Sequence, residues 1–214
     1  MLLIRREVAE ALRTFANADA DTVGAVATAL IDALDDVDEL ARIAAARSLA
    51  RFGKFSRVAL PKLVGYLELE NQALRKAALI ALASMGLDAK SALPMIVTVA
   101  ISPATENDAE LRTFLAIALR AIGPDAATPL LAELKNADPS VRVRAARALG
   151  SMQIIAAPAV LDLIELCQSV VDTDAQAGFL LIVCPSGGLQ KGQTCPHGCR
   201  ERNQVAAERR RGCR

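Results

Sequence analysis

The chain has 214 residues, of which 53% are hydrophobic but only 3% are aromatic, and its formal net charge at pH 7 is +1. The near-neutral charge excludes a protein that binds nucleic acid or acidic membranes through a large excess of basic residues. The composition also argues against a β-sandwich, because a core of small aliphatic side chains, rich in Ala and Leu, favours stacked helices.

The first 183 residues are typical of a cytoplasmic protein. All five cysteines lie at or after Cys167, so they cannot form a disulfide framework for the residues before them. The opening MLLIRREVAE lacks the apolar core of a signal peptide, and the longest apolar run, ALPMIVTVAI, is too short to cross a bilayer. We therefore expect a cytoplasmic protein that has no membrane partner.

Two helices are predicted at the start of the chain. Residues 4–16 carry Val8, Leu12 and Phe15 on one face, and TVGAVATALIDAL, residues 22–34, forms a second apolar segment. No helix precedes residues 4–16 in this sequence. We therefore expect their apolar face to have a neighbour on one side only.

One pattern then recurs along the chain. Arginines recur at intervals of 30 to 37 residues. Each arginine after the first is preceded, four positions earlier, by a residue that can cap a helix. The arginines are Arg5, Arg42, Arg75, Arg112 and Arg142, and the capping residues are Asp38, Asn71, Asp108 and Asp138. Apolar residues three, four, seven and ten positions after each arginine form one helical stripe. Gly53, Gly86 and Gly123 are expected to end three of these helices.

A further helix is predicted between each such helix and the next. The strings ALPKLV, ALPMIV, ATPLLA and AAPAVL place a proline in its first turn, where the missing backbone N–H costs nothing. Each unit is thus an antiparallel pair, a proline-led first helix and an arginine-marked second helix, and neither can bury its stripe alone. The sequence predicts an all-α, right-handed solenoid of about five helix pairs over residues 1–183.

These features resemble HEAT repeats, most of all the short HEAT-like repeats of phycobilin lyases. The resemblance rests on the proline-led first helix, the Asp before the second helix, the pair Val141 and Arg142, and the string AARALG. It implies a ladder of polar residues that ties neighbouring units together. The ladder would consist of Asp38, Arg42, Asn71, Arg75, Asp108, Arg112, Asp138 and Arg142. It also implies a concave surface lined by second helices, where a non-catalytic scaffold or adaptor would bind a partner protein.

Arginines that do not recur in every unit are the candidate partner-binding residues. Counted from the recurring arginine, positions two, five, eight and nine of the second helix are expected to face outward. These positions hold Arg13, Arg47, Arg51, Arg120, Arg144 and Arg147, and the last five are the partner-binding candidates. Arginine forms bidentate pairs with carboxylates, so the arginines indicate an acidic segment of a partner protein. The alternative interpretation is ordinary solvated surface charge.

No catalytic residue, metal or cofactor is expected. The one histidine is His197, and no established catalytic motif occurs in the chain. The acidic string DALDDVDE, residues 32–39, is interpreted as a solvated turn with a helix cap, because it lacks the Gly and the distal Glu of a calcium-binding loop. Two other functions stay open: an accessory or catalytic subunit of the phycobilin lyase kind, and a nucleic-acid-binding module. The groove lacks the aromatic residues that stack on single-stranded bases, which disfavours nucleic acid.

Residues 184–214 differ in composition from the repeats. They are rich in Gly, Cys and Arg, have little aliphatic periodicity, and are expected to be disordered. The string CPHGC could offer Cys195, His197 and Cys199 to zinc, but its spacing is not a standard zinc arrangement. We hypothesise that the chain is a fragment of a longer array, followed by out-of-frame or unrelated residues.

Overall fold

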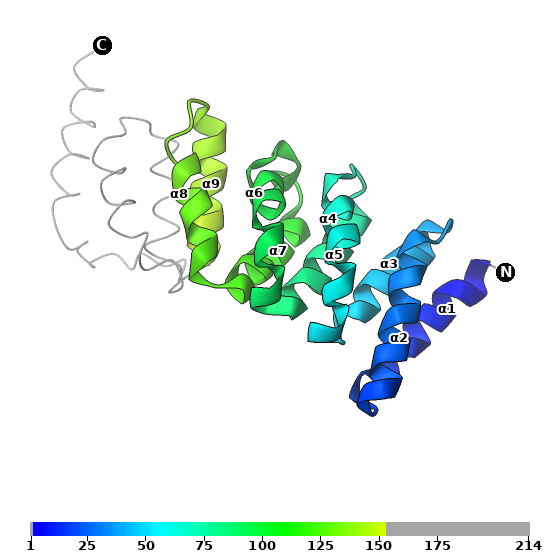
Figure 1. Ribbon diagram of the computed structural model, residues 1–214. Coiled ribbons are helices and arrows are strands. Elements are labelled where there is room, and N and C mark those ends of the chain that lie inside the picture. The colour runs from blue at the N-terminus through cyan, green and yellow to red at the C-terminus, as the bar shows by residue number, and fades with distance from the viewer. Residues whose placement is uncertain (1, 153–214) are drawn as a thin grey trace, which may run out of the picture. The chain divides into compact units, whose positions relative to one another are not determined.

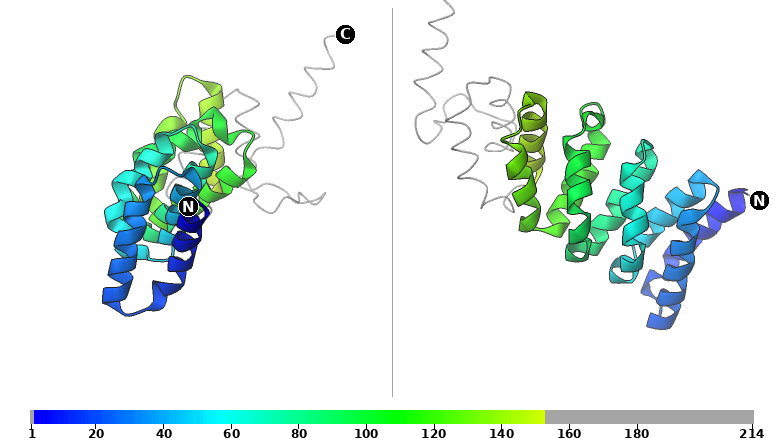
Figure 2. Two further views of the ribbon diagram at one scale, coloured as in Figure 1. Left: turned by 90° about the vertical axis from the view of Figure 1, so that its right-hand side faces the viewer. Right: turned by 45° about the horizontal axis from the view of Figure 1, so that its top comes forward.

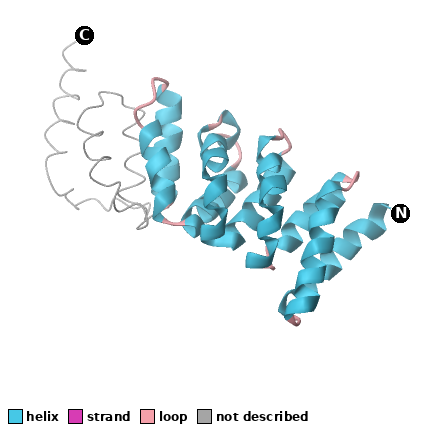
Figure 3. Cartoon of the chain, in the orientation of Figure 1, coloured by secondary structure: helices cyan, strands magenta, loops and turns pink. Residues whose placement is uncertain are grey.

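The computed structural model describes residues 2–152, which form α-helices joined by turns and short 3₁₀ helices (Figures 1 and 3). The α-helices are α1 (Leu2–Leu12), α2 (Ala20–Asp32), α3 (Glu39–Leu49), α4 (Leu60–Glu68), α5 (Gln72–Met85), α6 (Leu93–Ile101), α7 (Ala109–Ile122), α8 (Ala127–Glu133) and α9 (Pro139–Ser151). No β-strand occurs within the described range. Successive helix pairs lie side by side from α2 and α3 (blue) to α8 and α9 (yellow-green), as Figure 2 also shows. The predicted all-α solenoid is confirmed. The expected tail, residues 184–214, lies outside the described residues.

Each second helix after α1 begins at a polar side chain that accepts a backbone hydrogen bond. Asp38 accepts from the N–H of Leu40, and Asn71 accepts from the N–H groups of Ala73 and Leu74. In the same way, Asp108 accepts from Leu111 and Asp138 accepts from Ser140. Each bond satisfies an N–H group that would otherwise lack an intrahelical partner, so the capping residue fixes where the helix starts.

Glycines in the left-handed region separate each second helix from the turn that follows. Gly53, Gly86 and Gly123 have φ angles of 49°, 58° and 98°. A residue with a Cβ atom rarely adopts these angles, which is why glycine directly follows α5 and α7. Gly53 instead lies four positions after Leu49, the last residue of α3, and begins the 3₁₀ helix that follows. The chain then makes a short 3₁₀ helix and enters the next first helix, where Pro61 and Pro94 occupy the first turn of α4 and α6.

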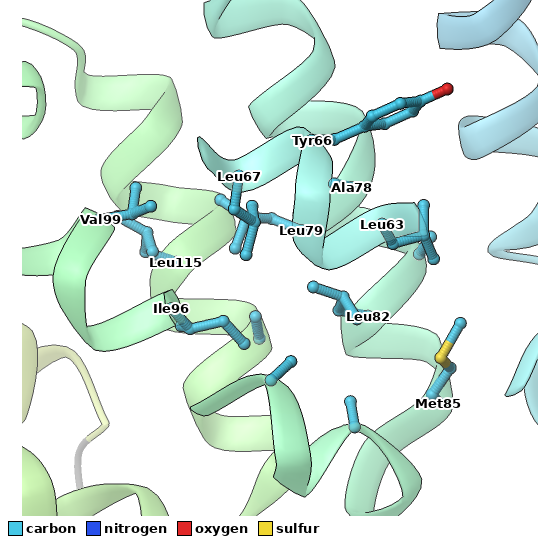
Figure 4. Close-up of a cluster of buried hydrophobic side chains, with 14 of the residues drawn as sticks. Leu63, Tyr66, Leu67, Ala78, Leu79, Leu82, Met85, Ile96, Val99 and Leu115 are labelled. Carbon is cyan, nitrogen blue, oxygen red and sulfur yellow. The ribbon is translucent and has the colours of Figure 1, made fainter. Parts of the chain in front are cut away.

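The two helices of each pair bury their apolar stripes against each other and against the neighbouring pairs. Leu63 from α4, Leu79 and Leu82 from α5, Ile96 from α6 and Leu115 from α7 belong to one continuous core (Figure 4). Burying an aliphatic side chain of this size contributes about 1.5–3 kcal/mol. The leucines seven positions after Arg42, Arg75, Arg112 and Arg142 are all fully buried, whereas Leu12, seven positions after Arg5, is partly buried.

A buried tyrosine joins the first two complete pairs. The Tyr66 hydroxyl of α4 donates a hydrogen bond to the backbone carbonyl of Leu34, just after α2. Burial raises the pKa of Tyr66 to about 12, so the hydroxyl keeps the proton it donates. Tyr66 is therefore a structural link and not a candidate acid or base.

From α1 to α7, neighbouring second helices pack more closely than neighbouring first helices. α3 contacts α5, and α5 contacts α7, along much of their length, whereas α4 meets α6 over a short stretch. Small buried residues at the contact make this possible, including Ala44 and Ser48 on α3 and Ala77 and Ala81 on α5. Ser48 donates a hydrogen bond to the carbonyl of Ala9 on α1, 2.8 Å away. The second helices thus form the tighter row, as is typical of the inner side of a curved helical stack.

Helix α1 and the short 3₁₀ helix after it (Arg13–Asn17) leave apolar side chains exposed. Val8 and Phe15 remain about half exposed, whereas Ala9 is buried against α3. The residues equivalent to Phe15 in the next units, Phe52 and Met85, are buried. The difference follows from packing, because α1 contacts α3 extensively and α2 only slightly.

One stretch has the length and hydropathy of a membrane span. Residues 72–101 reach a mean hydropathy of 1.4. They form two helices, α5 and α6, which turn at Gly86 and contribute Leu79, Leu82 and Ile96 to the core. The apolar character of this stretch is therefore explained by packing between repeat units.

Candidate functional site

The exposed surface of the second helices is the candidate site. We define the second-helix face as the residues five, eight and nine positions after the recurring arginine on α3, α5, α7 and α9. It comprises Arg47, Ala50 and Arg51; Ile80, Ala83 and Ser84; Ile117, Arg120 and Ala121; and Arg147, Gly150 and Ser151. The face has no Asp or Glu, so its four arginines set its charge.

Four of the five predicted partner-binding arginines lie on this face. Arg47, Arg51 and Arg120 are exposed, and Arg147 is half-buried. None of the four forms an ion pair within residues 2–152. The arrangement leaves four guanidinium groups whose donors can bind a carboxylate from another molecule.

The fifth, Arg144, is placed differently from the prediction. Its side chain is only 7% exposed, its Nε donates to the carbonyl of Ile101, and its guanidinium pairs with the carboxylate of Glu106. The residues at the same position on α3 and α5 are the buried Ala44 and Ala77. The expectation that position two faces outward was wrong, because on a helix it lies next to position six, which faces the preceding second helix.

The recurring arginines bind the loop inside their own helix pair. Arg42 donates to the carbonyl of Asp36, and Arg75 donates to that of Leu67. Arg112 donates to Thr105 and Glu106, and Arg142 donates to Asn136 and Ala137. These bonds satisfy carbonyls between the first and second helices, so the arginines close the loop of each unit. The resemblance implied that Asp and Arg tie neighbouring units together. Arg5 does so through Asp36 in the next unit, whereas the bonds of Arg42, Arg75 and Arg112 stay within their own helix pair.

Other charged residues connect neighbouring units. Arg57 lies 3.7 Å from Asp88, and Lys90 lies 2.5 Å from Asp125, in the turns that follow the second helices. In both pairs the base stands four positions after the turn glycine and the acid stands two positions after the glycine of the next unit. Sequence reasoning missed this ladder, although the recurring spacing from each glycine was the signal that could have revealed it.

Acidic residues of the string DALDDVDE form ion pairs with neighbouring helices. Asp35 lies 2.6 Å from the Nζ of Lys62 on α4, and Asp36 lies 3.1 Å from Arg5 on α1. A hydrogen bond from the N–H of Asp38 and the nearby Arg5 lower the pKa of Asp36. No group of three or more His, Cys, Asp and Glu residues is placed to hold a metal within residues 2–152. His197, Cys195 and Cys199 lie outside that range.

A small pocket lies between α7 and α9, beside the second-helix face. Its walls include Ala100 from α6, Leu115 and Leu119 from α7, and Arg147, Ala148 and Ser151 from α9. The pocket volume is about 40 Å³. Three arginines border the pocket: Arg144 pairs with Glu106, Arg112 donates to the carbonyls of Thr105 and Glu106, and the side chain of Arg147 makes no ion pair or hydrogen bond among the described residues.

The repeat pattern matches a known family. The HEAT repeats family matches residues 3–83 and 27–104, which together span α1 to α6 and the turn after it. Residues 3–104 of this chain consist of HEAT-like repeats. The α2–α3 and α4–α5 pairs are therefore HEAT-like units, α6 begins a third, and α7, α8 and α9 continue the same pattern of helices. The predicted resemblance is confirmed.

Solved structures share the fold of these HEAT-like repeats. An engineered protein from the Northeast Structural Genomics Consortium is 24% identical, with a TM-score of 0.50 over 83% of this chain and 88% of that one. The complex of CpcE and CpcF of phycocyanin lyase from Nostoc sp. PCC7120 is also 24% identical, with a TM-score of 0.50 over 84% of this chain and 70% of that one. These likenesses show the fold alone. No curated protein matches the chain significantly.

Proposed function

We propose that this HEAT-like protein is a non-catalytic scaffold or adaptor that binds an acidic segment of a partner protein along the second-helix face. The observation that carries the proposal is the charge pattern of that face, which has four arginines, no carboxylate, and no ion pair to any of the four within residues 2–152. Unpaired charges of one sign favour a ligand of the opposite sign and speed its association.

The spacing of the arginines suggests how long the acidic segment is. Arg47 and Arg51 lie on α3, whereas Arg120 and Arg147 lie on α7 and α9. Packed helices are about 8–10 Å apart, so α3 and α7 are separated by about 20 Å. An extended chain rises about 3.3 Å per residue, so a segment of about six to ten residues would reach both groups.

The centre of the face suits a backbone lying across it. Ile80, Ala83 and Ser84 on α5 are uncharged and, apart from Ile80, small, as is Ala121 on α7. Small side chains allow close approach, and their neutrality leaves the charged contacts at the two ends. This pattern supports a ligand with acidic residues near both ends of the contact.

Other proteins of similar fold also support a protein partner. HEAT-like solenoids commonly act as scaffolds, and a solved protein of similar fold is a complex of two subunits, CpcE and CpcF. That likeness does not favour a bilin-handling role for this chain, because an engineered protein matches it with the same TM-score. Nucleic acid is also disfavoured, since the second-helix face holds no aromatic side chain on which bases could stack.

We propose a non-catalytic role because the face offers arginines, aliphatic residues and serines with no neighbouring general base. A cytoplasmic location is proposed on the sequence argument alone, from the absence of cysteines before Cys167.

Peptide binding to the full 214-residue chain tests the proposal. Fluorescein-labelled polyglutamate is the probe, and polyglutamine of equal length is the uncharged reference. The test variant carries Arg47→Gln, Arg51→Gln, Arg120→Gln and Arg147→Gln. The matched control removes four charges from exposed residues away from the face, through Lys54→Gln, Arg57→Gln, Lys90→Gln and Lys135→Gln.

We expect polyglutamate to bind the wild-type chain and the control with similar affinity. The four-arginine variant should bind at least about tenfold more weakly, which corresponds to about 1.4 kcal/mol. Binding should also weaken as salt is added, because exposed charges are screened. Equal affinity for the two variants would contradict the proposal, and so would equal binding of polyglutamate and polyglutamine.

A further inference from the structure

The seam between α7 and α9 is more open than the seams between earlier second helices. α7 touches α9 over a few residues, whereas α5 packs along much of α7. The burial of the residues six positions after the recurring arginine differs in the same way between the seams. Ser48, Ala81 and Ala118 are fully buried against the preceding second helix, but Ala148 of α9 is partly exposed.

Arg144 lies beside the open seam. It occupies the position that holds Ala44 on α3, Ala77 on α5 and Phe114 on α7. Its side chain reaches toward the end of α6, donates to the carbonyl of Ile101, and pairs with Glu106. Its charge is neutralised by Glu106 and is not available to a ligand.

The pocket that results is suited to one small aliphatic side chain. Leu115, Leu119 and Ala100 form apolar walls, and the volume is about 40 Å³. A cavity of about 150 Å³ is needed to take up a benzene ring, so an aromatic side chain is too large for this pocket. Arg112, which also borders the pocket, already donates to the carbonyls of Thr105 and Glu106.

Arg147 gives the pocket its link to the second-helix face. It borders the pocket, belongs to the face, and makes no ion pair within residues 2–152. A ligand side chain in the pocket would therefore have apolar carbon around it and the guanidinium of Arg147 next to it, while Arg112 uses its donors on the carbonyls of Thr105 and Glu106. Charge complementarity selects an acidic neighbour for that side chain.

We propose that the seam between α7 and α9 anchors the acidic partner segment through a valine-sized aliphatic side chain, with an adjacent carboxylate bound by Arg147. The inference rests on the proposed function, because it assigns a specificity pocket within the same surface. The expected motif in the partner is an aliphatic residue flanked by acidic residues. A segment that is acidic throughout would lack the anchor.

Two peptides test the anchor on the full-length chain. One has a central valine with two glutamates on each side, and the other has serine in place of the valine. Ala148→Leu fills the pocket, and Ala132→Leu places the same side chain on the exposed side of α8 as a control. Thermal unfolding adds a readout without ligand: Ala148→Leu should keep or raise the Tm, whereas Ala118→Leu, in a closed seam, should lower it.

We expect the valine peptide to bind the wild-type chain and Ala132→Leu about fivefold more tightly than the serine peptide, since each buried methylene contributes about 0.8 kcal/mol. In Ala148→Leu this preference should disappear while the serine peptide binds as before. Equal binding of the two peptides to the wild-type chain would overturn the anchor and leave the proposed function standing. A preference that survives in Ala148→Leu would do the same. Absence of binding by both peptides would contradict the anchor and the proposed function together.

Discussion

Lys76 on α5 binds Asp108 at the start of α7, with 2.9 Å between Nζ and Oδ2. The same carboxylate accepts a hydrogen bond from the N–H of Leu111, so one side chain both caps α7 and joins it to the preceding unit. Glu110 adds a second contact to Lys76 at 2.7 Å. The Leu111 hydrogen bond and the Lys76 charge lower the pKa of Asp108, and the two carboxylates raise the pKa of Lys76.

Acid should weaken the solenoid through such carboxylates. The pKa values of Asp19, Asp36 and Asp108 are all lowered, mainly by backbone hydrogen bonds. A carboxyl whose pKa is lower in the folded state stabilises the fold above its unfolded pKa, and this contribution is lost as the pH falls through the folded pKa. Urea unfolding should therefore show a falling free energy of unfolding from about pH 5 to about pH 2. Asp108→Asn, which cannot titrate, should make this fall smaller. An unchanged pH dependence in Asp108→Asn would contradict the assignment.

The cap of α9 gives a second prediction. Asp138→Ala should lower the free energy of unfolding by about 1 kcal/mol, because the N–H of Ser140 loses its acceptor. Asp138→Asn keeps a side-chain oxygen and should cost much less. Chemical denaturation measures both variants, and equal losses would show that the negative charge matters and the cap does not.

The central core gives a third prediction. Leu119 is fully buried, so Leu119→Ala should cost about 2–5 kcal/mol through lost contacts and a new cavity. Leu87, in the turn after α5, is 70% exposed, and Leu87→Ala should change stability by about 0.5 kcal/mol or less. Chemical denaturation measures the free energy of unfolding of both variants. Equal losses of stability would contradict the burial pattern.

The two neighbouring arginines of α9 should behave differently. Arg144→Ala removes the donor to the Ile101 carbonyl and the partner of Glu106, and should cost about 1–3 kcal/mol. Arg147 makes no ion pair in the described range, so Arg147→Ala should stay within about 0.5 kcal/mol of wild type. A loss for Arg144→Ala no greater than that for Arg147→Ala would contradict its role as a buried link to Ile101 and Glu106.

Local signals in the sequence were enough to predict the helix pairs. The caps at Asp38 and Asp108, the glycine at position 86 and the proline-led first helices each act within a few residues, and their recurrence fixes the period of the solenoid. The buried stripe could be predicted for the same reason, since Leu82 and Leu119 occupy equivalent positions of one helical pattern.

The surface was predicted less completely because exposure depends on contacts between units. Arg144 occupies a position that helical periodicity alone places near the edge of the exposed face, and the preceding unit decides that it is buried. The ladder from Arg57 to Asp88 likewise joins residues from different units. Which side chains meet there depends on how the units stack, and a pattern read within one unit does not contain that information.

The most direct test of the account is the spectrum of the arginine Nε–H groups of the isotope-labelled full chain, recorded as polyglutamate is added. Single Arg→Gln variants would assign the signals. We predict that the signals of Arg47, Arg51, Arg120 and Arg147 shift together, while that of Arg57, on the ladder between turns, stays in place. Shifts confined to Arg57 and other arginines outside the second-helix face would contradict the claim that this face binds an acidic partner.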